Sequence, residues 1–352
     1  MPKEFQNYKR TIDAFLQEFL TKKSDTLSTI NSWGNDVAQR LAAFVGQGKT
    51  IRGGLVLFTC EMLGKPISHD AVACAAAVEL FQSGLLIHDD IMDKDAMRRG
   101  QRSMYMQYEE VARRRHVQDA TRFGENMGIC AGDASFFLAF SALNTLRENV
   151  STLQKIYTLM TQEYLTVYIA QMQDIALGNM THVPSEDDIL RVYLYKTARY
   201  TFALPMLIGS ILAGSSETIR HQLAQLGEHI GLLFQIQDDM LNLIGTAKTT
   251  GKPIGSDIRE GKKTLAYLSL YNHASQQERK RLTGIFGNRD MTEHEMSYVH
   301  ELLEKYHIID KLKKTCEGYI EKSKAIIDAL SIDKTYRQSL LDMVSFATSR
   351  TS

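Results

Sequence analysis

Residues 71–92 read AVACAAAVELFQSGLLIHDDIM, a stretch that is apolar almost all round a helix. Such a helix is buried on all faces inside a larger protein. The chain contains only 5 prolines in 352 residues, and so few helix breakers favour helix. Extended runs of alternating apolar and polar residues, which signal strands, are nearly absent. The sequence therefore predicts an all-α protein.

Helical periodicity continues on both sides of this stretch. Further long helices are predicted over residues 128–147, 152–177, 186–213, 217–243, 309–330 and 334–347. No change in composition marks a linker, so we expect one domain over residues 1–352, built from ten or more helices. Two polar stretches, residues 101–125 and 246–263, are predicted to be surface loops.

The overall composition excludes some classes of protein. Lys plus Arg is 41 and Asp plus Glu is 41, and a formal net charge of zero argues against a nucleic-acid partner. No uninterrupted apolar run reaches the ~18–20 residues that span a bilayer, and the N-terminus lacks the pattern of a signal peptide, so no transmembrane segment is expected. The cysteines are scattered without a CxxC motif, which predicts free, buried thiols in a reducing cytoplasm. They are Cys60, Cys74, Cys130 and Cys316.

Two aspartates one helical turn apart stand at the end of the opening stretch and directly after it. Asp89 and Asp93 are four residues apart and share one face of a helix. They follow an apolar run that should be buried, and buried carboxylates need a counter-charge. Carboxylate oxygens suit Mg²⁺, which also takes substrate phosphates as ligands. We therefore expect Asp89 and Asp93 to bind Mg²⁺.

A second acidic pair stands at the end of another apolar helix. Residues 235–242 read QIQDDMLN, in which Asp238 and Asp239 are followed by Asn242. One such pair alone is more typical of a solvated helix end. Two pairs, each after an apolar helix and each followed by basic residues, predict a shared metal site.

Basic residues lie close to both acidic pairs and in segments that contain glycine. Each of them alone is more typical of surface charge, but together with the carboxylates they predict a site for a diphosphate bridged by Mg²⁺. Arginine offers a planar fork to phosphate oxygens and lysine a mobile point charge. The residues in question are Lys49, Arg52, Arg98, Arg99, Lys196 with Thr197, Lys252 and Lys262.

Six motifs resemble those of the trans-isoprenyl diphosphate synthases, the family of farnesyl and geranylgeranyl diphosphate synthases. They are GKTIRGG (48–54), VELFQSGLLIHDDIMDKDAMRRG (78–100), CAGDASF (130–136), YKTA (195–198), FQIQDDMLN (234–242) and GKPIGSDIREGKKT (251–264). The resemblance implies an isoprenoid synthase fold, in which the helices surround a central cavity. It implies a prenyltransferase that joins isopentenyl diphosphate head to tail to an allylic diphosphate and releases diphosphate. It also implies a homodimer.

The resemblance further implies roles for individual residues. Three Mg²⁺ ions per active site would be held by Asp89, Asp93 and Asp238. The allylic diphosphate would be contacted by Arg98, Lys196, Thr197, Gln235, Lys252 and Lys262. Isopentenyl diphosphate would be held by Lys49, Arg52, Gln82 and Arg99. These ligands would be oriented by Asp90, Gln171, Asp174 and Asp239. Among them, the catalytic set would be Asp89, Asp93, Arg98, Lys196, Asp238 and Lys252.

The sequence departs from the family pattern at three places. Gly53 stands where the family usually has proline, which could loosen that turn. Asn242 replaces the last aspartate of the second motif and keeps an acceptor oxygen without the charge. Residues 106–123 form a longer connection than usual.

Product length should depend on the residues one turn before Asp89. Gly84 and Leu85 lie five and four residues before it, about one turn deeper on a similar face. Farnesyl-producing relatives often carry an aromatic ring at this depth, and Gly84 would leave it open. The floor would then be formed by Phe81 with Phe136, Phe137 or Phe140. We expect geranylgeranyl diphosphate, with a longer polyprenyl product or farnesyl diphosphate as alternatives.

Two other readings are compatible with parts of the sequence. A class I terpene cyclase would share the fold and the first aspartate pair. It would need neither the Lys49–Arg52 site nor the second aspartate pair. A catalytically silent partner subunit would be expected to lack some of the aspartates or basic residues, and here all of them are present.

Overall fold

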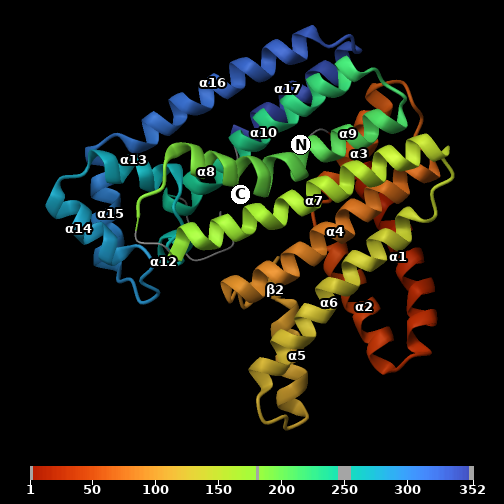
Figure 1. Cartoon of the computed structure of the whole chain (residues 1–352), viewed down its shortest axis with the longest axis horizontal. Coiled ribbons are helices and arrows are strands. Elements are labelled where there is room, and N and C mark those ends of the chain that lie inside the picture. Colours follow the sequence, from red (N-terminus) through yellow and green to blue (C-terminus); the bar gives the residue numbers. More distant parts are fainter. Residues whose placement is uncertain (1–2, 180–181, 245–254, 349–352) are drawn as a thin grey trace. The chain divides into compact units, whose positions relative to one another are not determined.

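The computed structural model describes residues 3–179, 182–244 and 255–348, and nearly all of them are helical (Figure 1). The described strands are one short pair, β1 (Met97–Arg98) and β2 (Gln101–Arg102). The predicted all-α fold is therefore confirmed.

The chain divides into two compact units. The N-terminal unit comprises residues 3–155 and 208–215, and the C-terminal unit comprises the described residues within 156–207 and 216–348. The single domain expected over the whole chain stays a prediction.

The N-terminal unit contains residues 71–92, the apolar stretch from which a buried helix was predicted. Its elements are α1 (Glu4–Ser28), α2 (Ser32–Gly46), α3 (Ile51–Met62), α4 (His69–Asp93), the β1–β2 pair, α5 (Met104–Arg114) and α6 (Ala120–Leu143). Helix α7 (Val150–Asn179) begins in this unit and continues in the other, whereas α9 (Leu204–Leu212) begins in the C-terminal unit and ends here.

Helix α4 is the centre of the N-terminal unit. The Ser68 side chain begins it by accepting a hydrogen bond from the Ala71 N–H at 3.2 Å. Every residue from Ala71 to Gly84 is buried, which confirms the helix predicted over 71–92. Lys94 ends it in the left-handed conformation with φ of 59°. This arrangement leaves the aspartates at the end of a helix that the rest of the unit holds in place.

A tight hairpin follows α4. Arg98 pairs with Gln101 and Met97 with Arg102 in an antiparallel register. The two turn residues, Arg99 and Gly100, have φ of 53° and 77°. Positive φ at both positions is typical of two-residue hairpin turns. The hairpin thus fixes the direction of the arginines that follow the first aspartate motif.

The expectation of a surface loop over residues 101–125 was wrong for most of that stretch. Helix α5 occupies Met104–Arg114 and α6 begins at Ala120. The buried positions of α5 recur at helical spacing and pack against α6. They are Met104, Tyr105, Tyr108, Glu109 and Ala112.

The C-terminal unit contains the second acidic pair. Its further elements are α8 (Glu186–Val192), the π-helix η1 (Tyr193–Ala203), α10 (Glu217–Ile244), α12 (Ser256–Arg259), α13 (Leu265–His273), α14 (Gln276–Ile285), α15 (Glu293–Lys305), α16 (Ile308–Ala329) and α17 (Lys334–Thr348). Helices α10, α16 and α17 pack side by side (Figure 1).

The helix predicted over 186–213 is continuous but changes its winding. It begins as α8 with a capping box between Ser185 and Asp188, becomes the π-helix η1, and returns to α-helix at Leu204. Helix α10 approaches η1 so closely that a Cβ on Gly227 would lie 2.6 Å from the Cα of Ala203. Wide π-turns of this kind are frequent at functional sites.

Two described helices are long and apolar enough to cross a membrane by length and composition alone. They are α4 and α6, whereas the sequence analysis counted only uninterrupted apolar runs and found none. In α4, 83% of the apolar window is buried inside the protein, as in a core helix, and in α6 the share is 44%.

All four cysteines are free. Cys60, Cys74 and Cys316 are buried as predicted, and burial raises the pKa of the Cys60 thiol to about 12. The expectation of burial was wrong for Cys130, which lies on an exposed face of α6.

Candidate active site

The first aspartate motif forms the last turns of α4. Asp89 and Asp93 lie one turn apart and are half-buried, whereas Asp90 between them is fully buried. The Asp89 side chain keeps 27% of its surface exposed. The helix therefore presents two accessible carboxylates on one face and turns the third into the protein.

Arg98 ties the hairpin to this helix end. Its Nε donates to Asp90 Oδ1 at 2.6 Å, and its Nη2 lies 3.1 Å from Asp95 Oδ2 and 3.8 Å from Asp89 Oδ2. Burial raises the pKa of Asp90 to about 6, although the charge of Arg98 opposes this. In the structure the Arg98 guanidinium is bound to carboxylates. The expected contact between Arg98 and a diphosphate therefore stays a prediction.

The hairpin turn also reaches the GKTIRGG segment. Arg99 donates from Nη1 to the carbonyl oxygen of Phe44 at 2.8 Å, with its guanidinium 5.2 Å from the centre of that ring. A Cβ on Gly48 would lie 2.9 Å from Arg99 Nη1, so the missing side chain makes room for the guanidinium. The structure thus brings Arg99 to the segment that carries Lys49 and Arg52.

Gly53 has a specific partner in this chain. Its N–H belongs to the first turn of α3, where a helix leaves its donors unsatisfied, and it donates to Glu79 Oε1 at 2.8 Å. A proline could not donate this bond. Burial raises the pKa of Glu79, while the Gly53 bond and the nearby charges of Arg52 and Arg99 oppose the rise. The hydrogen bond between Gly53 and Glu79 therefore holds this turn. The proline that the family usually has at position 53 could not make it.

Gln82 lies one turn after Glu79 on α4. It is 5% exposed, and its Oε1 has no hydrogen-bond partner among the described residues. A buried polar atom without a partner is costly unless a ligand or water satisfies it. Gln82 is therefore suited to a polar substrate in the same unit as Lys49, Arg52 and Arg99.

In the C-terminal unit, a hydrogen-bonded chain links η1 to α10. The Thr197 hydroxyl donates to Gln235 Oε1, and Gln235 Nε2 donates to Asp239 Oδ1, both at 2.8 Å. The Tyr193 hydroxyl donates to the other oxygen of Asp239 and accepts from the Leu265 N–H at 3.0 Å. Burial raises the pKa of Asp239 well above its usual range. Asp239 is thereby committed to this network, and Asp238 lies half-buried beside it.

Three ion pairs fix η1 to its neighbours. Lys196 Nζ lies 2.5 Å from Asp174 Oδ2 on α7, as expected of an orienting carboxylate. Arg199 donates from Nε to Glu163 on α7 at 3.0 Å and pairs with Glu228 on α10. Arg199 is not among the predicted site residues, although it lies three residues after Lys196 and hence on a neighbouring part of the helix surface.

The segment after α10 contributes Asp257, an acidic residue that is not among the predicted site residues. Asp257 accepts a hydrogen bond from Asn242 Nδ2 at 3.1 Å and lies 3.6 Å from Lys262 Nζ. Lys262 is also 2.7 Å from Glu260 Oε2. Asn242 thus has a structural partner that an aspartate at this position would repel. Lys252 lies outside the described residues.

The donor set fits Mg²⁺ rather than a closed metal cage. Among the described residues, no three His, Cys, Asp or Glu side chains gather as ligands of one ion. Mg²⁺ is usually bound through one or two carboxylates, waters and substrate phosphates. The half-buried pair Asp89 and Asp93 meets that requirement.

The residues expected to set product length pack differently from the prediction. A Cβ on Gly84 would collide with the ring of Phe136, so the expectation that Gly84 leaves this depth open was wrong. The Phe136 ring stacks 6.0 Å from Phe81, and the Phe140 ring meets Phe81 edge-on at 5.1 Å. Phe137 is 74% exposed and takes no part in this layer. The layer formed by Phe81, Phe136 and Phe140 is called the aromatic layer below.

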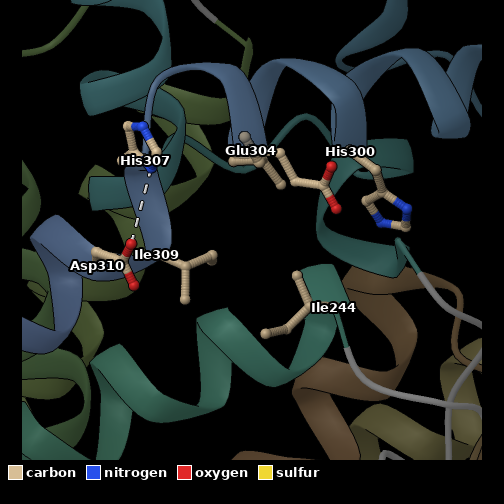
Figure 2. Close-up of a pocket in the computed structure, with 7 residues that line it drawn as sticks. Ile244, His300, Glu304, His307, Ile309 and Asp310 are labelled. Atoms are coloured by element: carbon tan, nitrogen blue, oxygen red, sulfur yellow. Dashed lines mark ion pairs between the residues drawn. The ribbon is translucent and has the colours of Figure 1, made fainter.

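A cavity of about 520 Å³ opens in the C-terminal unit between α10, α15 and α16 (Figure 2). His300 and Glu304 line it from α15, and His307 and Asp310 line it from the start of α16. The distance between His307 Nδ1 and Asp310 Oδ2 is 3.9 Å. None of the predicted site residues lines this cavity, so it is separate from the candidate active site.

Known proteins match the chain over most of its length. A sequence model of the polyprenyl synthetase family matches residues 35–303. A short chain isoprenyl diphosphate synthase of Methanocaldococcus jannaschii is 35% identical over 76% of this chain and 75% of its own length. A geranylgeranyl diphosphate synthase of Saccharolobus solfataricus is 29% identical over 87% of this chain and 88% of its own.

A solved structure agrees with these sequence matches. It is a geranylgeranyl pyrophosphate synthase of Corynebacterium glutamicum, complexed with isoprenyl diphosphate and magnesium. It superposes with a TM-score of 0.91 at 26% identity and covers 97% of this chain and 98% of its own.

Proposed function

Because this chain belongs to the polyprenyl synthetase family and is a trans-prenyltransferase, we propose that its main product is geranylgeranyl diphosphate. The reaction class is the condensation of isopentenyl diphosphate with an allylic diphosphate. Support for the product comes from the names of the Saccharolobus and Corynebacterium proteins, which match this chain over nearly its whole length. Farnesyl diphosphate is the second candidate, because the Phe136 ring occupies the space beside Gly84 that was expected to be open.

The proposal assigns isopentenyl diphosphate to the N-terminal unit. Lys49, Arg52 and Arg99 would bind its diphosphate, and Gln82 would contribute its buried amide. Two observations support this: Arg99 packs on Gly48, and Gln82 Oε1 lacks a partner among the described residues. Arginine forks and lysine charges are the usual protein ligands of phosphate oxygens.

The proposal assigns the allylic diphosphate to Arg98 and to residues of the C-terminal unit. The η1 and α10 residues are Lys196, Thr197 and Gln235, and the following segment adds Lys252 and Lys262. The hydrogen bond between Thr197 and Gln235 supports their acting together. Asp174 holds Lys196 and would give up part of that bond when the diphosphate arrives. The KM for the allylic substrate in a Lys196→Ala variant tests this assignment.

Asp89 and Asp93 would bind Mg²⁺ with the substrate phosphates, and the motif assigns Asp238 to the same task. Bound Mg²⁺ neutralises the negative charge that develops on the leaving diphosphate. Lys196 and Thr197 would donate hydrogen bonds to the oxygens of that group as its C–O bond breaks. The double bond of isopentenyl diphosphate then attacks the allylic carbon, and the released diphosphate takes the proton that is lost. Apolar walls around the site would keep water from quenching the allylic cation.

The expected result for the purified chain is Mg²⁺-dependent elongation of farnesyl diphosphate by one isoprene unit. The measurement is chromatography of dephosphorylated products after incubation with labelled isopentenyl diphosphate and dimethylallyl, geranyl or farnesyl diphosphate in turn. Removing Mg²⁺ with a chelator should stop product formation, and adding it back should restore it. No elongated product with any primer would contradict the reaction class. Elongation that ends at farnesyl diphosphate would favour the second candidate.

We also propose that the protein is a homodimer. Helices α6 and α7 each carry large exposed apolar side chains, and exposed apolar surface is typical of protein–protein interfaces. They are Ile129 and Phe137 on α6 and Leu165, Ile169 and Met172 on α7. We expect a solution mass near twice the 39.8 kDa of one chain by light scattering, and a single-chain mass at micromolar concentration would contradict this.

A further inference from the structure

The turn between α2 and α3 is tied to the N-terminal helix. On α1, Lys9 Nζ donates to the carbonyl oxygen of Gly46 at 2.9 Å and lies 3.5 Å from Thr50 Oγ1. It also pairs with Asp13 one turn along α1 at 2.8 Å. Lys9 therefore connects α1 to both ends of the turn that carries Lys49. It lies outside residues 35–303, which match the family.

Thr50 at the end of this turn is strained. Its φ of 51° and ψ of 41° are left-handed, a conformation that β-branched residues rarely adopt. It is 3% exposed and has no side-chain cap bond to α3. A strained residue persists only where its surroundings hold it, and such residues gather at functional sites. Lys9 reaches both Gly46 and Thr50 from outside the turn.

We propose that Lys9 is a positioning residue for isopentenyl diphosphate, which it orients by holding the strained turn at Thr50. This inference rests on the proposed role of Lys49 and Arg52. The backbone angles of Thr50 set the direction of Lys49 relative to Arg52, which lies in the first turn of α3, two residues after Thr50. Without Lys9, Thr50 relaxes toward the right-handed region, and the two cations no longer face one diphosphate together. Binding geometry of this kind requires such support from residues behind the contacting side chains.

Lys9→Met tests the inference, because methionine keeps the unbranched side chain as far as Cε but has no ammonium group to donate. We expect the KM for isopentenyl diphosphate to rise about tenfold, with the KM for the allylic substrate and kcat within about twofold of wild type. Calorimetric titration with isopentenyl diphosphate should show the same loss. Arg52→Ala is the comparison for direct loss of a ligand. Lys22→Met is the matched control, because Lys22 is also on α1 and also pairs with an acid one turn away, Glu18.

A second variant separates positioning from loss of charge. Glycine adopts positive φ without strain, so Lys9→Met combined with Thr50→Gly should recover most of the affinity for isopentenyl diphosphate. If Lys9 acted only through its charge, the double variant would bind as weakly as Lys9→Met, which would overturn the inference. The double variant carries no strained residue at position 50, so it keeps the test decisive if Lys9→Met alone unfolds.

Wild-type activity with isopentenyl diphosphate is measured first. Its absence would refute the proposed function itself. An active wild type together with an unchanged KM in Lys9→Met would refute only the role of Lys9. A rise in KM that Thr50→Gly reverses would support it.

Discussion

Asp89→Ala should lower turnover about a hundredfold or more while the protein keeps its fold. Asp89 is half-buried on the accessible face of α4, one turn before Asp93. Its loss removes an oxygen ligand of Mg²⁺ and leaves charge on the departing diphosphate less neutralised. Arg98 keeps Asp90 and Asp95 as partners, so the helix end should stay in place. Asp93→Ala should behave alike.

The measurement is single-turnover kinetics at saturating substrates, beside a melting curve. Asp25→Ala serves as the control, because Asp25 is an exposed aspartate on α1 outside the candidate active site. The two active-site variants should also need more Mg²⁺ for half-maximal rate, whereas the control should not. Turnover like that of wild type in either Asp89→Ala or Asp93→Ala would refute the metal assignment.

The sequence could predict α4 and its aspartates because both depend on local order. A stretch of helical length that is apolar almost all round indicates a helix surrounded by apolar neighbours, and the observed bounds differ from the prediction by two residues at one end and one at the other. Four-residue spacing then puts Asp89 and Asp93 on one face without any knowledge of neighbouring helices.

The π-winding of η1 could not be predicted in this way. The apolar periodicity of residues 186–213 is that of one helix. The wider turns of η1 accompany side-chain bonds to other helices, such as those of Tyr193 and Thr197 to α10. Because π-winding is rare, tertiary contacts of this kind, which the sequence does not show, are needed to explain it. Helix α5 was missed for a related reason: its apolar face is short, and the polar residues around it dominate the pattern.

The packing at Gly84 could not be predicted, because it depends on how α4 and α6 are aligned against each other. The sequence of α4 shows that residue 84 has no side chain, but not which residue of α6 fills the space. In the structure each helix offers a glycine to a ring of the other: Phe136 lies on Gly84, and His88 lies on Gly132. His88 Nε2 also lies 3.1 Å from the carbonyl oxygen of Ile129. Because of this pairing, the aromatic ring that lies beside Gly84 comes from α6.

Phe136→Ala should therefore lengthen the product by about one isoprene unit or more. On α4, Gly84 lies five residues before Asp89 and Phe81 lies eight residues before it. At ~1.5 Å per residue, removing the Phe136 ring lowers the first obstruction by about 4.5 Å. A growing chain that extends along α4 would then reach Phe81 before it stops. The half-buried position of Phe136 keeps the cost to stability below that of a fully buried phenylalanine.

Phe137→Ala is the matched control, because Phe137 is the next residue on α6 and is 74% exposed. It should leave product length unchanged within the same chain, whatever its effect on assembly. Gly84→Phe should not simply shorten the product, because its ring would collide with Phe136 and lower the melting temperature. Chromatography of dephosphorylated products, with melting curves for all three variants, distinguishes these effects. A folded, active Phe136→Ala enzyme with the wild-type product length would show that the aromatic layer does not limit elongation.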